Sequence, residues 1–216
     1  CAHNGNLTNT EALKRELDAA GAIFQTTTDT EVFLHLVARA PAGSPVDRVI
    51  HALRSARGAF SVVFLIGDTL IAARDPSGFR PLSLGILERA HVLASEPTAF
   101  DLIAAEFVRD IEPGEMVVVD GSGVRSFRPF EPAPARFCVF EHVYFARPDS
   151  VLGGRAVYAT RKRLGAVLSR VAPVEADLVI PVPDSGVPAA VGYAEAARLP
   201  FEMGLIRSHY VGRTFI

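Results

Sequence analysis

The sequence predicts a chain built from two different kinds of domain. Helical patterns followed by antiparallel strand patterns fill the first part, and this order is typical of layered α+β packing. The last third instead alternates strand and helix patterns, which indicates βαβ units around a parallel sheet. A proline-rich connector, residues 130–135, lies between them. We therefore expect one domain at residues 1–129 and a second at residues 130–216.

The composition is that of a soluble globular protein. Lys and Arg number 22 against 24 Asp and Glu, with no long run of either sign, so we expect neither nucleic acid nor a membrane surface as a partner. No apolar stretch is long enough to cross a bilayer, and we expect no signal peptide. The two cysteines, Cys1 and Cys138, form no disulfide framework, and a reducing cytoplasm is the expected compartment.

Three helices are expected in the first part, each from its own local signals. Thr8 and Glu11 have the spacing of a capping box, and Gly21 gives the first helix a C-terminal stop. The second helix begins near Thr30. The third is capped by Ser44, with a proline at its first position.

Strand patterns then follow in antiparallel pairs. Residues 59–66 and 69–74 are rich in β-branched and aromatic residues and flank a Gly-Asp turn, as in a hairpin. The other elements expected here are hairpin strands 82–87 and 91–94, a short helix at 100–106, and strands 115–119 and 124–127.

The second part is expected to supply the alternating elements of a parallel sheet. These are strands 139–145, 178–182 and 201–206, and helices 155–169 and 187–198. The middle strand is an unbroken apolar run, which predicts burial on both faces.

A polar loop, Pro183-Asp184-Ser185-Gly186, joins the middle strand to the last helix. A strand, a tight loop and a helix start form an anion-binding site, because backbone N–H groups and the positive helix end point at the loop. The local pattern alone favours an ordinary turn with a serine cap. Asp184 suggests that an anionic ligand brings a metal, because a bare carboxylate repels phosphate.

Three further motifs could carry chemistry or simply build turns. In His3-Asn4-Gly5-Asn6, an amide beside a glycine N–H can present two donors to a developing oxyanion, although Asn-Gly is more often just a turn. Asp29 can bind an ammonium group or cap the helix that follows it. The stiff loop at residues 75–82 has turn-building as an equally good interpretation.

The ordered set of motifs resembles the glutamine amidophosphoribosyltransferase family, which makes phosphoribosylamine in purine synthesis. The motifs are His3–Leu7, Thr28–Glu31, Asp75–Leu82, Ala94–Glu96, Tyr144–Ser150, Pro183–Ser185 and Tyr210–Ile216. The first four are shared among N-terminal-nucleophile (Ntn) glutamine amidotransferases. The last three separate this family from the glucosamine-phosphate and asparagine synthases.

The resemblance implies a two-step enzyme, with both domains incomplete here. An Ntn glutaminase domain of the αββα type would release ammonia from glutamine. An α/β type I phosphoribosyltransferase domain with a parallel sheet would use it to displace pyrophosphate from phosphoribosyl pyrophosphate (PRPP) with Mg²⁺. By motif, Asn4 and Gly5 would form the oxyanion hole and Asp29 would hold the glutamine amino group. Ser185 would contact the Mg²⁺–PRPP unit, with Asp184 shaping its loop.

The resemblance also implies a cytoplasmic homo-oligomer, a dimer or tetramer, with purine nucleotides as regulators. In the family, the nucleophile is an N-terminal cysteine far upstream of the His-Asn-Gly-Asn motif, with its own α-amino group as base. Here Cys1 stands three residues before Asn4, so it is either a chance boundary residue or the product of an internal deletion, and it is the one candidate nucleophile. The family's ribose-phosphate signature is absent, and we expect an internal fragment with little or no synthase activity of its own.

Two questions stay open at this level. Cys138 stands where some members place one of four iron–sulfur ligands of a 4Fe-4S cluster, but a cluster needs further thiolates, and packing as a small apolar residue is the alternative. Two other functions also fit: a non-catalytic module that senses PRPP or purine nucleotides, and another Ntn glutamine amidotransferase.

Overall fold

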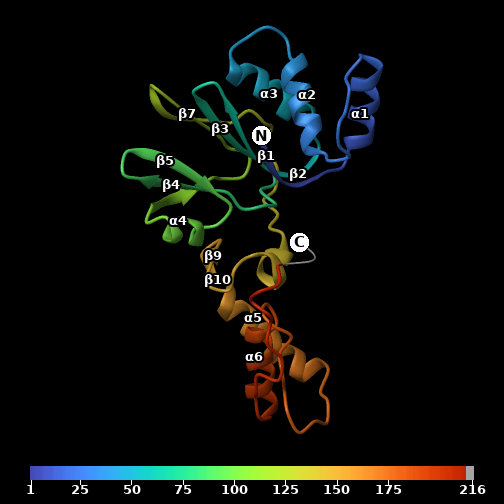
Figure 1. The fold of residues 1–216 in the computed structure, drawn as a ribbon, viewed down its shortest axis with the longest axis vertical. Helices are drawn as coiled ribbons and strands as arrows, with labels where there is room; N and C mark the ends of the chain where they lie inside the picture. Colours follow the sequence, from blue (N-terminus) through green and yellow to red (C-terminus); the bar gives the residue numbers. More distant parts are fainter. Residues whose placement is uncertain (213–216) are drawn as a thin grey trace. The chain divides into compact units, whose positions relative to one another are not determined.

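The computed structural model describes residues 1–212 and divides into two compact units, Cys1–Cys138 and Val139–Ile216 (Figure 1). The division falls after the proline-rich connector. The backbone N–H of Arg136 donates to the carbonyl of Ser77 at 2.7 Å, and that of Cys138 to the carbonyl of Phe79 at 3.2 Å. These two main-chain bonds hold the end of the connector on the first unit.

Two antiparallel sheets form the strand layers of the first unit. The larger has the order β1-β2-β3-β7-β8, so β1 is an edge strand among the described residues, and the smaller has the order β5-β4-β6. The larger sheet consists of β1 (Ala2–Leu7), β2 (Gly58–Ile66), β3 (Thr69–Arg74), β7 (Met116–Asp120) and β8 (Gly123–Phe127). The smaller consists of β4 (Ser83–Leu87), β5 (Ala90–Ala94) and β6 (Glu106–Asp110). The two predicted hairpins and the predicted strands at 115–119 and 124–127 are confirmed, whereas β1 and β6 lie where no strand was predicted.

The predicted helical segments of the first unit are confirmed as α1 (Thr10–Ala19), α2 (Thr30–Arg39) and α3 (Pro45–Ser55). At α3 the Ser44 hydroxyl accepts from the N–H of Asp47 at 3.2 Å, and the Asp47 carboxylate accepts from the N–H of Ser44 at 3.0 Å. The capping box predicted for Thr8 and Glu11 is wrong. The Thr8 hydroxyl instead donates to the carbonyl of Arg57 at 3.2 Å, and α1 begins at Thr10 with no side-chain cap.

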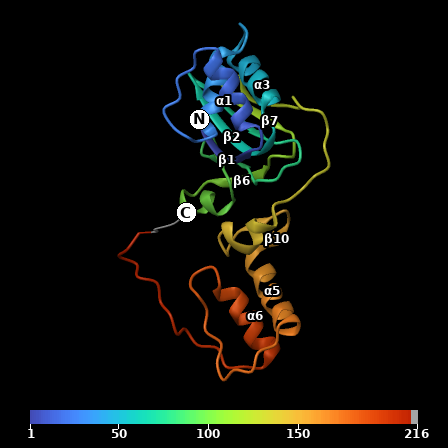
Figure 2. The ribbon, with the colours of Figure 1, turned by 90° about the vertical axis from the view of Figure 1, so that its right-hand side faces the viewer.

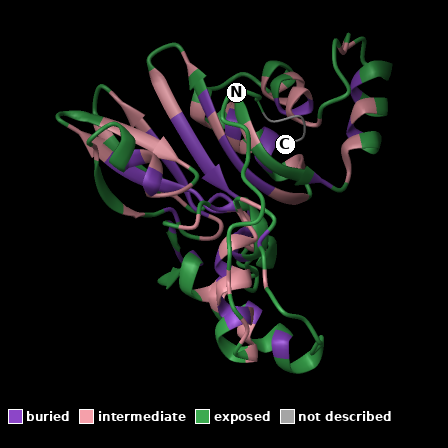
Figure 3. Cartoon of the chain, turned by 60° about the horizontal axis from the view of Figure 1, so that its bottom comes forward, coloured by how far each residue is buried: buried purple, intermediate pink, exposed green. Residues whose placement is uncertain are grey.

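Apolar side chains fill both faces of the larger sheet, and its central strands carry many of the buried residues (Figure 3). On one face, α2 and α3 bring Phe33 and Leu53 onto β2 and β3. On the other face, Ala72 of β3 meets Leu84 of the smaller sheet. A short helix, α4 (Thr98–Leu102), lies beyond that sheet and ends before the predicted 100–106 segment does. The helix–sheet–sheet–helix order is the αββα layering that the family resemblance implied.

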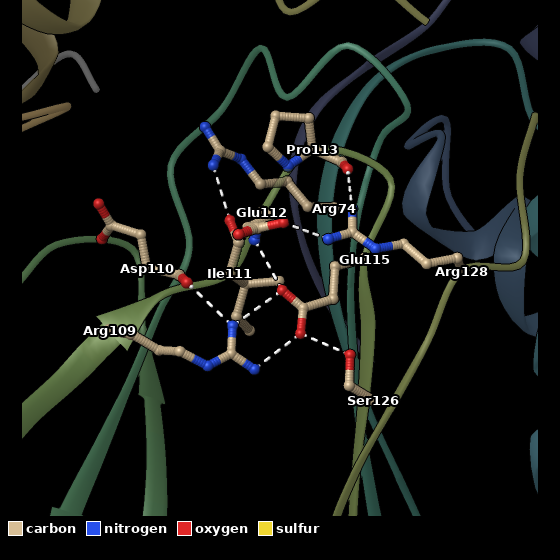
Figure 4. A network of polar contacts seen from close by, with 9 residues as sticks. All are labelled: Arg74, Arg109, Asp110, Ile111, Glu112, Pro113, Glu115, Ser126 and Arg128. Atoms are coloured by element: carbon tan, nitrogen blue, oxygen red, sulfur yellow. Dashed lines mark hydrogen bonds and ion pairs between the residues drawn. The ribbon is translucent and has the colours of Figure 1, made fainter. Parts of the chain in front are cut away.

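A buried carboxylate joins the two sheets (Figure 4). Glu115 is 2 % exposed and accepts two N–H bonds from Arg109 of β6, at 2.7 and 2.9 Å. It also accepts from the hydroxyl of Ser126 on β8 at 2.7 Å and from the N–H of Glu112 at 2.8 Å. Burial by itself raises the pKa of Glu115, but these donors outweigh burial and lower the pKa to about 2. The carboxylate therefore stays ionised and ties β6 to β8.

Two helices, α5 (Val157–Val171) and α6 (Val187–Ala197), form the centre of the second unit and confirm the predicted helical segments (Figure 2). The backbones of the two helices lie in close contact at two glycines, Gly165 on α5 and Gly192 on α6. A Cβ added to Gly165 would lie 1.8 Å from the carbonyl oxygen of Ala189, and one added to Gly192 would lie 1.8 Å from that of Lys162. Any larger residue at either position would push the two backbones apart.

The strand predicted at 139–145 is wrong. Residues Glu141–Phe145 form a π-helical turn, because the buried guanidinium of Arg161 on α5 donates to the carbonyls of His142 and Ala146, both at 2.7 Å. A two-strand hairpin, β9 (Val151–Leu152) and β10 (Arg155–Ala156), then precedes α5.

The other two predicted strands of this unit are reduced to one parallel bridge, between Val179 and Phe201. The parallel direction agrees with a βαβ connection. Burial on both faces is wrong, because Leu178, Ile180 and Val182 are 45 %, 46 % and 72 % exposed. Within residues 1–212, no further strand covers this apolar run.

Candidate functional site

The His3-Asn4-Gly5-Asn6 motif lies inside edge strand β1, and it does not form the turn that its Asn-Gly pair suggested. Gly5 has a φ of +147°, and a Cβ built there would lie 2.0 Å from the carbonyl oxygen of Ala59 on β2. Close approach of β2 therefore requires glycine at this position.

The free side of β1 presents backbone donors. The N–H of Thr8 points to β2, since it donates to Arg57 at 2.8 Å, whereas the N–H of Leu7 points the other way and donates to the Asp29 carboxylate at 2.9 Å. Successive N–H groups of a strand point to opposite edges. The N–H of Gly5 therefore faces the same open edge as that of Leu7.

Asp29 precedes α2 but makes no side-chain capping bond, so the structure favours a role other than helix cap. One carboxylate oxygen accepts from Leu7, and the other lies 3.4 Å from Nδ1 of His3. The carboxylate is 21 % exposed and therefore remains reachable by a small cation at the open edge of β1.

His3 supports Asp29 from beneath the strand. Its side chain is 1 % exposed and packs edge-on against Phe33, with ring centroids 5.3 Å apart. Burial lowers the pKa of His3, with Asp29 opposing the effect, so the imidazole is neutral at pH 7. The ring has two neighbours that only accept hydrogen bonds, the Asp29 carboxylate and the carbonyl of Ala59.

Asn4 points to the opposite face of the sheet from His3, into a cavity of about 270 Å³. Its side-chain oxygen accepts from Nε and Nη2 of Arg80, at 3.1 and 2.9 Å. Ser95, from the Ala94–Glu96 motif, also lines this cavity. The fold thus brings three of the sequence motifs to one place.

The loop at residues 75–82 is built around a buried acid. Asp75 is 1 % exposed, and its carboxylate accepts from the N–H groups of Ser77, Gly78 and Phe79 at 2.9 to 3.1 Å, and from that of Phe60 at 3.2 Å. Burial raises the pKa of Asp75, and these four donors oppose the rise. Turn-building is therefore the right interpretation for Asp75, and the turn carries Arg80 to Asn4.

Both cysteines lie in the first unit, and their proposed roles stay predictions. Cys1 is exposed and directly precedes β1, so its Cα lies about 10 Å from that of Asn4 at an extended rise. Cys138 is half-buried, with its sulfur 3.8 Å from Nη1 of Arg80. The chain's two cysteines are fewer than the four thiolates that a cluster needs, and we derive no step through one.

In the second unit, the Asp184–Gly186 loop leads directly into α6, as predicted. The Pro183–Asp184 peptide bond is cis. The N–H of Gly186 donates to the carbonyl of Val182 at 3.2 Å, and a Cβ on Gly186 would lie 2.6 Å from that oxygen. Ser185 is half-buried beside it, and the Asp184 carboxylate pairs with Arg207 at 3.3 Å.

Residues 1–212 contain no group of three or more His, Cys, Asp or Glu side chains placed to hold a metal ion. Asp184 and Ser185 would thus need the oxygens of a bound diphosphate to complete a Mg²⁺ site, and we derive no step through the metal. Residues 213–216 of the Tyr210–Ile216 motif lie outside the described residues.

Two residues of the site were not assigned a role from the sequence: His3, which faces Asp29, and Arg80, which holds Asn4. Both lie inside motifs that the sequence singled out. Their roles depend on partners 26 and 76 residues away, which no local pattern reports.

Comparison with known proteins finds similar proteins for both parts of the chain. Residues 1–102 match the family model described as a glutamine amidotransferase domain. The whole chain is 53 % identical to the amidophosphoribosyltransferase of Rhizobium etli and 45 % identical to that of Bacillus subtilis, covering 44 % and 45 % of their lengths. A chloroplastic relative from Glycine max is 51 % identical over the whole chain, which covers 38 % of it.

A solved structure agrees with this similarity over both units. Glutamine PRPP amidotransferase from B. subtilis, complexed with ADP and GMP, matches all of this chain with a TM-score of 0.90, and the chain covers 47 % of it. The predicted Ntn glutaminase layer is confirmed, whereas the assignment of the second unit to a phosphoribosyltransferase stays a prediction. The chain is thus similar over its whole length to amidophosphoribosyltransferases, and it spans less than half the length of the relatives it matches.

Proposed function

We propose that this chain is part of an enzyme that makes 5-phosphoribosylamine, glutamate and pyrophosphate from glutamine, PRPP and water. The first unit would bind and hydrolyse glutamine. The observation that carries the proposal is the open edge of β1, where Asn4 and Gly5 offer donors and Asp29 offers a carboxylate. The similarity to amidophosphoribosyltransferases over the whole chain supports it.

The spacing along β1 suits a glutamine molecule. Asp29 is anchored at Leu7, two residues beyond Gly5, which corresponds to about 7 Å along a strand. An extended glutamine can cover this span with its ammonium group at Asp29 and its amide carbon at Gly5. The negative charge of Asp29 attracts the ammonium group, and the two N–H donors face the amide oxygen.

The same donors suit the chemistry of amide cleavage. Attack of a thiolate on the amide carbon moves an electron pair onto the oxygen, and Asn4 and Gly5 would stabilise this oxyanion. Collapse breaks the C–N bond, and the departing nitrogen takes up the proton that the thiol gave up and leaves as ammonia. Water then hydrolyses the thioester to glutamate and restores the thiol. By residue type Cys1 is the candidate thiol, but a thiol three residues along the same strand cannot be aimed at these donors by a neighbouring strand.

The second unit is proposed to bind PRPP with Mg²⁺. Ser185 and Gly186 precede α6, whose positive end favours a diphosphate. We also extend to this protein the remaining expectations of the family: purine nucleotides as regulators, a homo-oligomer, and a cytoplasmic location. No helix within residues 1–212 is both long and apolar enough to span a membrane.

The test uses the complete gene product, with glutamate and pyrophosphate measured separately. We expect PRPP-dependent glutamate release, pyrophosphate release with either glutamine or ammonia, and a fall in glutaminase kcat of about 10²- to 10³-fold in Asn4→Ala. A complete product that consumes neither substrate would refute the proposal. We expect no synthase turnover from the 216-residue chain, and turnover there would overturn that expectation. Binding of Mg²⁺–PRPP without turnover by the complete product would favour a sensing module.

A further inference from the structure

We propose that Arg80 is a positioning residue that sets the orientation of the Asn4 amide for glutamine hydrolysis. This inference rests on the proposed function and gives the loop at residues 75–82 a role beyond turn-building. Two nitrogens of the guanidinium, Nε and Nη2, converge on the side-chain oxygen of Asn4 at 3.1 and 2.9 Å.

The orientation follows from the donor and acceptor inventory. A guanidinium has five N–H donors and no acceptor, so only the oxygen of an amide can face it. With the Asn4 oxygen held by Arg80, the amide nitrogen turns its two hydrogens away, where they can donate to an oxyanion. The reversed amide would set its NH₂ against a cation and its oxygen against the developing negative charge.

The arginine is itself held in place from behind. Its carbonyl accepts from Nε of the buried Arg74 at 2.6 Å and from the hydroxyl of Ser61 at 3.0 Å. Ser61 is also the residue that pairs with Asn4 across β1 and β2. The backbone of Arg80 is therefore bonded to the same strand pair that carries Asn4. This keeps the Arg80 guanidinium at a fixed distance from the Asn4 side-chain amide.

The buried Asp75 completes this support. Its carboxylate gathers three successive N–H groups of the loop, those of Ser77, Gly78 and Phe79, just before Arg80. A loop fixed in this way loses little entropy when its arginine engages Asn4. The order of residues in the loop thus has a physical reason. Asp75 comes first and folds the turn, and Arg80 follows near its end and contacts Asn4.

The experiment compares Arg80→Met and Arg80→Lys with Arg89→Met in the complete gene product. Arg89 is exposed in the β4–β5 turn and serves as the matched control. We expect the glutaminase kcat of Arg80→Met to fall about 10- to 100-fold with KM for glutamine unchanged, since a misoriented donor loses part of an oxyanion contribution. Arg80→Lys keeps one donor and should retain more activity, and Arg89→Met should match the unchanged enzyme.

A second comparison separates positioning from a merely structural role. If Arg80 acts through Asn4, Arg80→Met should cause no further loss of kcat in the Asn4→Ala background. An equal loss in both backgrounds would overturn the proposal, as would a rise in KM with kcat unchanged. Circular dichroism shows whether Arg80→Met folds. If Arg80→Met is unfolded, the same comparison is made with Arg80→Lys.

A third readout does not depend on activity, so it distinguishes failure of the orientation proposal from failure of the proposed function. In the 216-residue chain, the NMR signals of the Asn4 side-chain NH₂ should shift and broaden in Arg80→Met, because the amide then rotates between two orientations. They should stay in place in Arg89→Met. Unmoved Asn4 signals in Arg80→Met would refute the orientation argument whatever the enzyme assay shows.

Discussion

Replacing Glu115 with glutamine is expected to destabilise the first unit by up to about 3 kcal/mol at pH 7. The side chain is 3 % exposed and accepts from Arg109, Ser126 and the N–H of Glu112. Glutamine has the same shape, but it keeps one acceptor oxygen and turns an NH₂ group toward donors. The variant therefore loses charge-assisted bonds and leaves buried donors facing each other.

The magnitude follows from the pKa of Glu115, which is lowered from 4.5 to about 2 in the folded protein. A difference of about 2.5 pH units corresponds to about 3 kcal/mol, an upper value for the net effect. Because the folded pKa lies below the unfolded one, this stabilisation is complete above about pH 5 and is lost as the pH falls toward 2. The glutamine variant does not titrate, so its stability should fall less than that of the unchanged chain over this window.

Urea unfolding followed by circular dichroism at pH 7, 5 and 3 measures both effects. Glu112→Gln is the matched control, because Glu112 also pairs with an arginine, Arg128, while its side chain is 64 % exposed. That variant should lose less than about 1 kcal/mol. Equal losses in the two variants at pH 7 would refute the reasoning, as would a Glu115 variant that weakens with acid as steeply as the unchanged chain.

Three further changes test the site and the second unit. Gly5→Ala should unfold or inactivate the first unit, since the added Cβ would lie 2.0 Å from a carbonyl oxygen. Gly21→Ala is the control, because Gly21 has a φ of +82° but no atom lies within 4 Å of its added Cβ. In urea unfolding this control should lose only about 1–2 kcal/mol of stability. Gly192→Ala should lower the melting temperature of the second unit, read from the helical circular dichroism signal, because it forces α5 and α6 apart; unchanged melting would contradict the glycine contact. In the complete gene product, Asp29→Asn should raise KM for glutamine about tenfold or more with kcat nearly retained, and the reverse pattern in steady-state kinetics would remove Asp29 from ammonium binding.

Elements fixed by local signals were predictable from the sequence. The Ser44 cap and the proline after it define α3, and the Gly-Asp turn defines the β2–β3 hairpin. In both cases the determining contacts join residues a few positions apart. The β1 strand was not predicted, because its partner lies far along the chain, with Asn4 opposite Ser61. Its short polar motif carries no alternation that indicates a strand.

The second unit shows the converse case, a strand that was predicted from the sequence but does not form. Residues 139–145 are apolar and aromatic enough to predict a strand, but the carbonyls of His142 and Ala146 are taken by Arg161 from α5. A buried guanidinium needs several acceptors, and a coiled backbone turn supplies carbonyls that a strand would give to a neighbouring strand. Tertiary demand therefore overrides β propensity at this position.

An edge strand normally has to hide its unpaired N–H groups, because they invite pairing with another chain. In β1, individual N–H groups on the exposed edge instead have separate partners or proposed roles. Leu7 gives its N–H to Asp29, and Gly5, two residues earlier, directs its own to the same side. Alternation along a strand also sends the side chains of His3 and Asn4 to opposite faces, one to support Asp29 and the other to meet Arg80. An extended strand therefore lets four of the five residues from His3 to Leu7 contact a carboxylate, present an amide and leave one N–H donor open, whereas a turn at Asn-Gly would separate these groups.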